Sequence, residues 1–232
     1  MIHDRYRLLS VAGRGASGRV FEVLDIQTDE PRALKVVLRG PHEAMLLDEF
    51  EQLARLRHPS LPRVFEVGRT RDPIEDMAAG SPFFVADWIA GARCDARDWD
   101  HDNARLWTCL ADVAGALATI HAAGLVHADV APQNVLVAPD GRAVLVDLGL
   151  ASGIGARGTP AYMAPEALAG QVEPRSDLYG LGVTVIRLVT GRPPFEAATL
   201  GELVQRIVGG LALRSLPGVA LPLADLIARL VS

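Results

Sequence analysis

The sequence has very little lysine. Of the 23 lysine and arginine residues, only Lys35 is a lysine, and it lies in the apolar stretch 32–38. An ammonium group is a compact point charge that suits a phosphate, whereas a guanidinium group is a wide planar fork. We therefore expect Lys35 to have a specific task on a buried strand, with a phosphate group as its first candidate ligand.

Cysteine, excess positive charge and long apolar runs are also scarce. The two cysteines, Cys94 and Cys109, have no metal-ligand spacing and are expected to be reduced thiols in the cytoplasm. A net charge of -5 argues against a general nucleic-acid binder. The sequence has no run of about 18 uncharged apolar residues, so we expect no membrane-spanning helix in it. The start, Met1 to Arg5, lacks the pattern of a secretory signal.

The first ninety residues have mainly strand-like patterns. Half of the 232 residues are hydrophobic, enough for one large domain or two lobes with a sizeable core. Alternating and apolar runs predict strands near 8–11, 20–24, 33–38, 64–67 and 83–88, and helical spacing predicts a helix over 43–57. The polar stretch 69–82 is expected to be a mobile loop.

The remaining residues are richer in helical patterns. Residues 102–123 are expected to form a long helix that ends at Gly124, and 135–137 with 143–146 a hairpin. Further helices are expected near 176–190, 199–209 and 220–231. The simplest architecture is α+β, with a small antiparallel sheet lobe over about 1–89 and a larger, mostly helical lobe over about 90–232.

A glycine pattern, Gly13-x-Gly15-x-x-Gly18, precedes the second expected strand. Dinucleotide-binding folds have the same spacing, but there the third glycine begins a helix. Here a strand follows, which disfavours a dinucleotide-dependent oxidoreductase and fits a backbone flap over phosphates. The pattern alone is weak, because an ordinary glycine-rich hairpin has it too.

Several polar motifs follow in a definite order. Segment 127–134, HADVAPQN, carries Asp129 and Asn134 just before a strand, and Asp147 begins Asp-Leu-Gly thirteen residues later. Segments 158–166, GTPAYMAPE, and 176–182, SDLYGLG, come next. From about Tyr6 to the C-terminus, this set resembles the protein kinase family, particularly the bacterial serine/threonine kinases of eukaryotic type.

The resemblance implies a two-lobed protein-kinase-like fold and a role for each motif. Lys35 would hold the α- and β-phosphates of ATP, and Asn134 and Asp147 would bind Mg²⁺. Asp129 would accept the proton of the substrate hydroxyl, and Thr159 would contact Asp129. The nucleotide-binding residues implied by the resemblance are Gly13, Gly15, Gly18, Val20, Ala33, Lys35, Glu49, Leu136 and the backbone of Asp87 and Ile89.

The partner of Lys35 is a helix carboxylate, for which Glu49 and Glu51 are the candidates. At 100° per residue, Glu49 lies roughly 70° from the centre of the apolar stripe of the helix and Glu51 about 130° away. Glu49 can therefore point inward. It also stands where the family places its glutamate, nine residues before His58.

Two alanines depart from the family pattern. Ala128 replaces the arginine that pairs with a phosphate on the activation loop, which predicts activity independent of activation-loop phosphorylation. Ala131 replaces a lysine that meets the γ-phosphate in serine/threonine kinases, and Arg14 and Arg157 are candidate substitutes.

The C-terminal region departs as well. The family continues through further helices beyond the point matching Ser232, and it supplies an arginine partner for the glutamate matching Glu166. A buried Glu166 without a cation would reduce stability. We therefore expect a C-terminally short kinase domain, or a piece of a longer protein with a regulatory region after Ser232.

The leading hypothesis is an ATP- and Mg²⁺-dependent kinase that phosphorylates serine or threonine hydroxyls of a protein substrate. The serine/threonine choice rests on the resemblance of Gly158-Thr159-Pro160. The alternative is a weakly active kinase, or a pseudokinase that serves as a nucleotide- or partner-binding signalling module, because Ala131 removes one phosphate contact.

Overall fold

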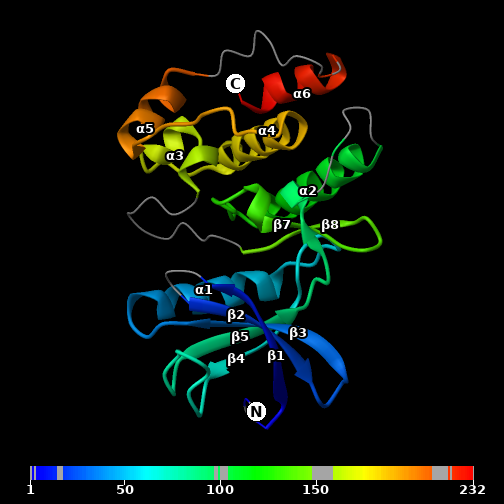
Figure 1. Ribbon diagram of the computed structural model, residues 1–232, viewed down its shortest axis with the longest axis vertical. Coiled ribbons are helices and arrows are strands. Elements are labelled where there is room, and N and C mark those ends of the chain that lie inside the picture. Colours follow the sequence, from blue (N-terminus) through cyan, green and yellow to red (C-terminus); the bar gives the residue numbers. More distant parts are fainter. Residues whose placement is uncertain are drawn as a thin grey trace. The chain divides into compact units, whose positions relative to one another are not determined.

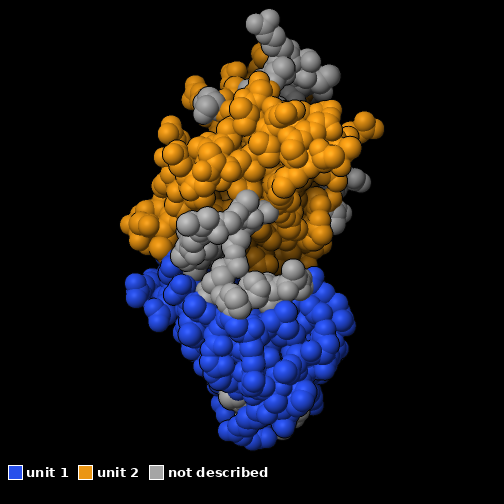
Figure 2. Space-filling model, turned by 90° about the vertical axis from the view of Figure 1, so that its left-hand side faces the viewer, with its two compact units in different colours: residues 1–57, 62–89 blue, residues 58–61, 90–232 orange. Residues whose placement is uncertain are grey.

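The computed structural model describes residues 2, 4–14, 18–96, 99, 104–147, 159–210, 219 and 221–231. The chain divides into two compact units, Met1–Arg57 with Pro62–Ile89 and His58–Leu61 with Ala90–Ser232 (Figure 2). The early segment His58–Leu61 belongs to the second unit because its carbonyl groups bind there: Ser60 accepts from the Leu145 N–H (2.9 Å) and Pro59 from the Arg142 guanidinium (2.6 Å).

The first unit is a five-stranded antiparallel sheet with one helix (Figure 1). Its strand order is β1-β2-β3-β5-β4, and the predicted strands and helix are confirmed with small changes in their ends. The elements are β1 (Tyr6–Arg14), β2 (Gly18–Asp25), β3 (Glu30–Val37), α1 (Pro41–Arg55), β4 (Val64–Arg69) and β5 (Pro82–Asp87).

One face of this sheet carries the apolar core of the unit. Successive residues of a strand point to opposite faces, and the buried set on this face is Phe21, Val23, Leu34, Val36, Phe83 and Val85, packed with Ile2, Tyr6, Ile74 and Met77. The stretch 69–82, expected to be a mobile polar loop, contributes two residues to this core, because Ile74 and Met77 are only 7% and 1% exposed. Two apolar residues in a polar stretch create no periodicity that could reveal their packing.

The opposite face presents Lys35 to α1. In the strand register Val20 and Phe84 both lie opposite Lys35, and Ala33 lies opposite Ala86, so these residues share one face. The Phe50 ring of α1 packs against the Phe84 ring, with centroids 6.2 Å apart. The helix that carries the candidate glutamates is thus held against the strand that carries the lysine.

The second unit is mainly helical and contains a three-stranded sheet of order β6-β7-β8 (Figure 1). The strand β6 and the short helices were not predicted. Among the described residues, no helix is both long and apolar enough to cross a membrane. The elements are β6 (Ala92–Arg93), η1 (Cys94–Ala96), α2 (Ala104–Ala122), η2 (Pro132–Asn134), β7 (Val135–Val137), β8 (Ala143–Leu145), η3 (Pro160–Tyr162), α3 (Pro165–Leu168), α4 (Pro174–Thr190), α5 (Leu200–Val208) and α6 (Leu221–Leu230).

The ends of α2 and α4 follow from local chemistry. Gly124 after α2 has φ 74°, a left-handed conformation that glycine adopts without strain, and its N–H binds the His121 carbonyl at 2.9 Å. At the start of α4, the Glu173 and Ser176 side chains each accept a hydrogen bond from the backbone N–H of the other. The predicted C-cap at Gly124 is confirmed.

Two glycines let α4 approach its neighbours closely. A Cβ on Gly180 would lie 2.8 Å from the carbonyl oxygen of Val130, and one on Gly182 would lie 2.6 Å from a methyl group of Val231 in the segment after α6. Val130 directly follows Asp129, so α4 packs against the backbone of the loop that carries this carboxylate.

Gly180→Ala is expected to lower the free energy of unfolding by about 1–3 kcal/mol, because the new methyl group meets a backbone oxygen that cannot move independently. The matched control is Gly201→Ala in α5, where an added Cβ meets no atom within 4 Å. That change is expected to stabilise the helix by about 0.5–1 kcal/mol. Urea unfolding followed by circular dichroism measures both, and equal changes would contradict the packing argument.

Candidate active site

Lys35 of β3 forms an ion pair with Glu49 of α1. Its Nζ lies 2.8 Å from both carboxylate oxygens, while Glu51 is exposed. Glu49 is 7% exposed, so its charge is withdrawn from water and compensated by the ammonium group. This placement agrees with the helical angle that favours Glu49 over Glu51. The pair fixes the position of the ammonium group on the Lys35 face of the sheet.

The glycines of the expected phosphate loop have different structural reasons. A Cβ on Gly18 would lie 2.1 Å from the Val36 carbonyl oxygen, so the close approach of β2 to β3 requires glycine there. At Gly13 the nearest atom would be 3.9 Å away, an ordinary contact. Gly15, expected to belong to the same loop, lies outside the described residues.

The candidate substitutes for the missing lysine are Arg14 and Arg157. Arg14 ends β1 and forms an exposed ion pair with Glu75 at 3.0 Å. Arg157 lies outside the described residues. The exposed pair of Arg14 is worth little energetically, so this arginine is restrained only weakly.

The expected adenine-binding residues are divided between the two units. Val20 and Ala33 lie on the same sheet face as Lys35, and Asp87 ends β5, with Ile89 two residues later. The Asp87 carboxylate accepts the Arg63 N–H at 3.0 Å, which fixes the end of the strand. Leu136 lies in β7 of the second unit and is half-buried.

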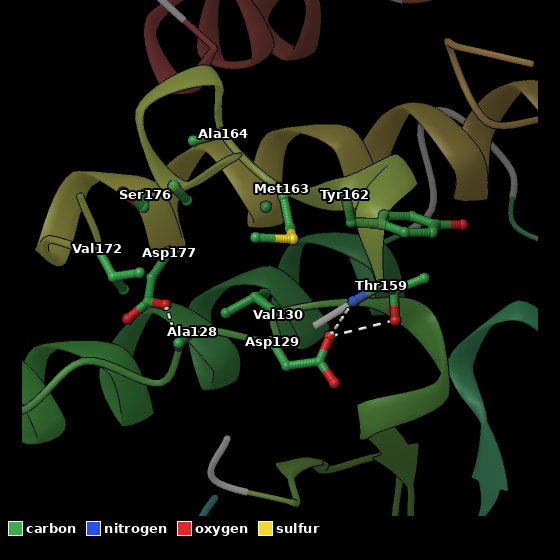
Figure 3. Close-up of a pocket in the computed structure, with 12 residues that line it drawn as sticks. Ala128, Asp129, Val130, Thr159, Tyr162, Met163, Ala164, Val172, Ser176 and Asp177 are labelled. Carbon is green, nitrogen blue, oxygen red and sulfur yellow. Dashed lines mark hydrogen bonds between the residues drawn. The ribbon is translucent and has the colours of Figure 1, made fainter. Parts of the chain in front are cut away.

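The carboxylate of Asp129 is held on both of its oxygen atoms. Oδ2 accepts a hydrogen bond from the Asn134 side-chain amide at 2.8 Å. Oδ1 accepts from the Thr159 N–H at 2.9 Å and from its hydroxyl at 3.2 Å (Figure 3). These three predicted residues therefore meet, although Thr159 is thirty residues beyond Asp129. Each carboxylate oxygen has two lone pairs, so Asp129 can still accept a substrate proton.

Asn134 also connects this loop to Asp147. The backbone carbonyl oxygen of Asn134 accepts a hydrogen bond from the N–H of Val146, the residue before Asp147, at 2.8 Å. Its side-chain nitrogen donates to the carbonyl and carboxylate oxygens of Asp129, which leaves the amide oxygen for a cation. Asp147 is exposed and has φ 56°, a left-handed conformation that is strained for a residue other than glycine.

The amide and carboxylate oxygens of Asn134 and Asp147 are ligands that Mg²⁺ accepts. Within the described ranges, no group of three or more histidine, cysteine, aspartate or glutamate side chains could hold a metal by itself. Magnesium in nucleotide sites uses one or two protein ligands together with phosphates and water. The residues present therefore fit a magnesium–nucleotide complex better than a dedicated metal cage.

Asp177, whose role the sequence reasoning did not assign, anchors the loop before Asp129. It stands in the first turn of α4, is 1% exposed, and accepts the N–H groups of His127 (2.8 Å) and Ala128 (2.7 Å). Its Oδ2 also lies 2.7 Å from Nε2 of His121. Ala128 has φ 67°, which costs about 1–2 kcal/mol. Segment 176–182, which contains Asp177, was one of the motifs that resemble the kinase family. An aspartate in the first turn of a helix is also common because it stabilises the helix dipole, so the motif did not reveal the anchoring role.

His127 is fully buried and links Asp129 to Val146. Its Nδ1 accepts the Asp129 N–H at 3.3 Å, so the ring hydrogen is on Nε2, which donates to the Val146 carbonyl at 3.2 Å. Burial lowers the pKa of His127 below its usual 6.5, against the opposing effect of nearby carboxylates. The neutral ring therefore holds the backbones of the two loops together.

Glu166 accepts a hydroxyl hydrogen bond, and the arginine of the family pattern, for which the sequence offers no match, is not beside it among the described residues. The Ser176 hydroxyl donates to its Oε1 at 2.8 Å, and the residue is half-buried. In the described part of the chain it forms no ion pair. The expected loss of stability was stated for a buried Glu166, and the half-buried residue meets this condition only in part, so the loss stays a prediction.

Asp177→Asn is expected to lower the free energy of unfolding by about 1–3 kcal/mol, because an amide presents a donor to one of the two buried backbone N–H groups. Asp225→Asn on the exposed side of α6 is the matched control and is expected to change stability by less than about 0.5 kcal/mol. Urea denaturation measures both. Equal effects would show that the Asp177 carboxylate is not an anchor.

The comparisons with known proteins agree with this geometry. The family model for the protein kinase domain matches residues 6–216. The DNA damage-responsive serine/threonine-protein kinase RqkA of Deinococcus radiodurans is 36% identical over 214 residues, covering 84% of this chain and 31% of the relative. The serine/threonine-protein kinase PknL of Mycobacterium tuberculosis is 32% identical over 226 residues, covering 89% and 55%.

A third relative, the serine/threonine-protein kinase pkn3 of Myxococcus xanthus, is 30% identical over 223 residues, covering 83% of this chain and 39% of the relative. The chain thus spans about a third to a half of the length of these curated relatives. The match of the family model and the two-lobed α+β fold show that this chain belongs to the protein kinase family, with bacterial serine/threonine kinases among its relatives.

Proposed function

We propose that this chain is an active protein kinase domain that transfers the γ-phosphoryl group of ATP to serine or threonine hydroxyls of a protein substrate. The observation that carries this proposal is the Asp129 carboxylate, which Asn134 and Thr159 hold on both oxygens. Residues 1–89 are the nucleotide-binding N-lobe of this domain, and residues 90–232 are its catalytic and substrate-binding C-lobe.

Asp129 acts as the acceptor for the proton of the attacking hydroxyl. Phosphoryl transfer needs little covalent chemistry from the protein, but it needs the nucleophile in line with the leaving oxygen. A carboxylate with fixed orientation provides this direction, and its remaining lone pair, on Oδ2, receives the proton. Thr159 and Asn134 keep the carboxylate from rotating.

Lys35 binds the α- and β-phosphates. Glu49 supports this role because the ion pair holds the Lys35 ammonium group against the sheet and keeps the side chain from extending into the solvent. Val20, Ala33 and Leu136 provide apolar contacts for the adenine, and the backbone groups of Asp87 and Ile89 provide its hydrogen bonds. The backbone around Gly13, Gly15 and Gly18 covers the phosphates.

Asn134 and Asp147 hold Mg²⁺, which when bound neutralises charge on the phosphate oxygens. The contribution of the chain is to keep the amide and the carboxylate adjacent through the bond between the Val146 N–H and the Asn134 carbonyl. Asp147, which is exposed and has a left-handed backbone, provides the carboxylate of this pair.

A second candidate function is a pseudokinase that binds nucleotide or a partner without transfer. Ala131 favours it, because this fully buried alanine supplies no cation where relatives carry a lysine. The carboxylate of Asp129, held by Asn134 and Thr159, favours activity instead, since a pure binding module has no need for an oriented base.

Phosphoryl transfer is tested with radiolabelled ATP, Mg²⁺ and a generic acceptor protein, beside the Asp129→Asn variant. The wild type is expected to label the acceptor, and the variant to lose about 10²–10⁴-fold in rate, the usual contribution of a general base. Stabilisation of both proteins by Mg²⁺-ATP in a thermal shift assay controls for folding. Thermal stabilisation without any labelling would establish the pseudokinase alternative.

We further propose that activity does not require phosphorylation of the segment between Asp147 and Glu166. Ala128 provides no cation for a phosphate, and the Thr159 hydroxyl is already bound to Asp129. Ser152→Ala, outside the described residues, is therefore expected to keep close to wild-type activity after phosphatase treatment of both proteins. Loss of most activity in the variant would contradict this. The cytoplasmic location and a regulatory region beyond Ser232 stay predictions.

A further inference from the structure

We propose that Gln133 is a positioning residue for this reaction, because its side-chain amide fixes the Thr159 hydroxyl as a donor to Asp129. The inference rests on the proposed function and adds a residue that the kinase motifs of the sequence did not single out. Gln133 is half-buried and lies in η2, directly before Asn134.

The hydrogen bonds run in one direction. Nε2 of Gln133 donates to Oγ1 of Thr159, and Oγ1 in turn contacts Oδ1 of Asp129 at 3.2 Å. A hydroxyl group has a single hydrogen, and a carboxylate only accepts. The hydroxyl hydrogen must therefore point to Asp129, and the glutamine must present its N–H. This assigns the amide orientation of Gln133 from the network itself.

Gln133 restricts a side chain that would otherwise have alternatives. The Thr159 backbone N–H already binds Oδ1 at 2.9 Å, but its hydroxyl can rotate about the Cβ–O bond and between side-chain rotamers. An N–H donor on the hydroxyl oxygen leaves the hydroxyl hydrogen directed toward the carboxylate. Asp129 then keeps two donors on Oδ1 and a third on Oδ2.

The turn that carries Gln133 is itself fixed. It has a proline at its first position, and its last N–H, from Asn134, binds the Ala131 carbonyl at 2.9 Å. Asn134 holds Oδ2 directly, and Gln133 acts on Oδ1 through Thr159. Two neighbouring amides of one turn thus orient the same carboxylate from its two sides, at a place where Ala131 brings no polar group.

Two substitutions test whether the hydrogen bond that the Gln133 amide donates matters, or only the size of its side chain. Gln133→Ala removes the amide, and Gln133→Glu keeps the size but offers only acceptors at neutral pH, so it draws the hydroxyl hydrogen away from Asp129. We expect kcat to fall about tenfold in the first variant, as for a misaligned reacting group, and at least as far in the second. The KM for ATP is expected to stay unchanged, since neither change touches Lys35 or Glu49.

Thr159→Val completes a double-mutant cycle, because it keeps the backbone N–H and the size but removes the hydroxyl. If Gln133 acts through this hydroxyl, Gln133→Ala lowers kcat in the wild-type background and causes no further loss in the Thr159→Val background. Gln171→Ala, an exposed glutamine of the same unit, is the matched control and is expected to leave kcat unchanged. An unchanged kcat in Gln133→Ala, or losses that multiply independently, would overturn the proposal.

The same assay separates this inference from the proposed function. Wild type and Asp129→Asn are measured beside the cycle, and equal labelling by these two proteins means that the proposed function has failed. In that case the melting temperatures of the wild type, the two single variants and the double variant are compared in place of their kcat values. Non-additive shifts of Gln133→Ala and Thr159→Val still establish the contact that fixes the hydroxyl, whereas additive shifts refute it.

Discussion

The Asp177 carboxylate, buried in the first turn of α4, is the constraint on which the rest of the candidate site depends. It accepts the N–H groups of His127 and Ala128 and so holds the backbone that leads into Asp129. A buried carboxylate with several donors is stable only while every donor stays in place. The loop depends on Asp177 in turn, because the hydrogen bonds to this carboxylate offset the strain of the left-handed backbone at Ala128.

From this anchor the site continues as a connected set of hydrogen bonds. His127 binds the backbones of Asp129 and Val146 through its two ring nitrogens, and Asn134 binds the Asp129 side chain. Groups that are already oriented do not have to reorganise when charge develops in a transition state. The arrangement is thus suited to a reaction in which positioning and electrostatics supply most of the rate, as they do in phosphoryl transfer.

Two of the departures from the family pattern have a neutral hydrogen bond near the place where the resemblance implied a cation. The Ser176 hydroxyl donates to Glu166, for which the resemblance implied an arginine, and the Gln133 amide contacts Thr159 beside Ala131, for which it implied a lysine. Neutral hydrogen bonds contribute less than charge-assisted ones, but they also avoid burying a second ion. A half-buried site with one lysine in the whole chain can be held in this way.

Local sequence patterns determined most of the secondary structure and several of the polar residues. Strand alternation located β3 with Lys35, the helical angle selected Glu49 over Glu51, and Gly124 marked the end of α2. These features depend on residues within one or two turns of each other, so periodicity reveals them. The order and spacing of the motifs then indicated the family, which neither composition nor a single motif could do.

The tertiary structure decided the contacts between distant segments. Asp177 meets His127 fifty residues away, Thr159 meets Gln133 at a separation of 26, and Ile74 and Met77 enter the core from a polar stretch. No local pattern marks such partners, because a hydrogen bond or an apolar contact depends on distance in space and not on distance along the chain. The sequence alone therefore determined which groups are candidates for the chemistry. Only the tertiary structure decided that Thr159 and α4 meet the loop that carries Asp129, because these contacts join segments far apart in the chain.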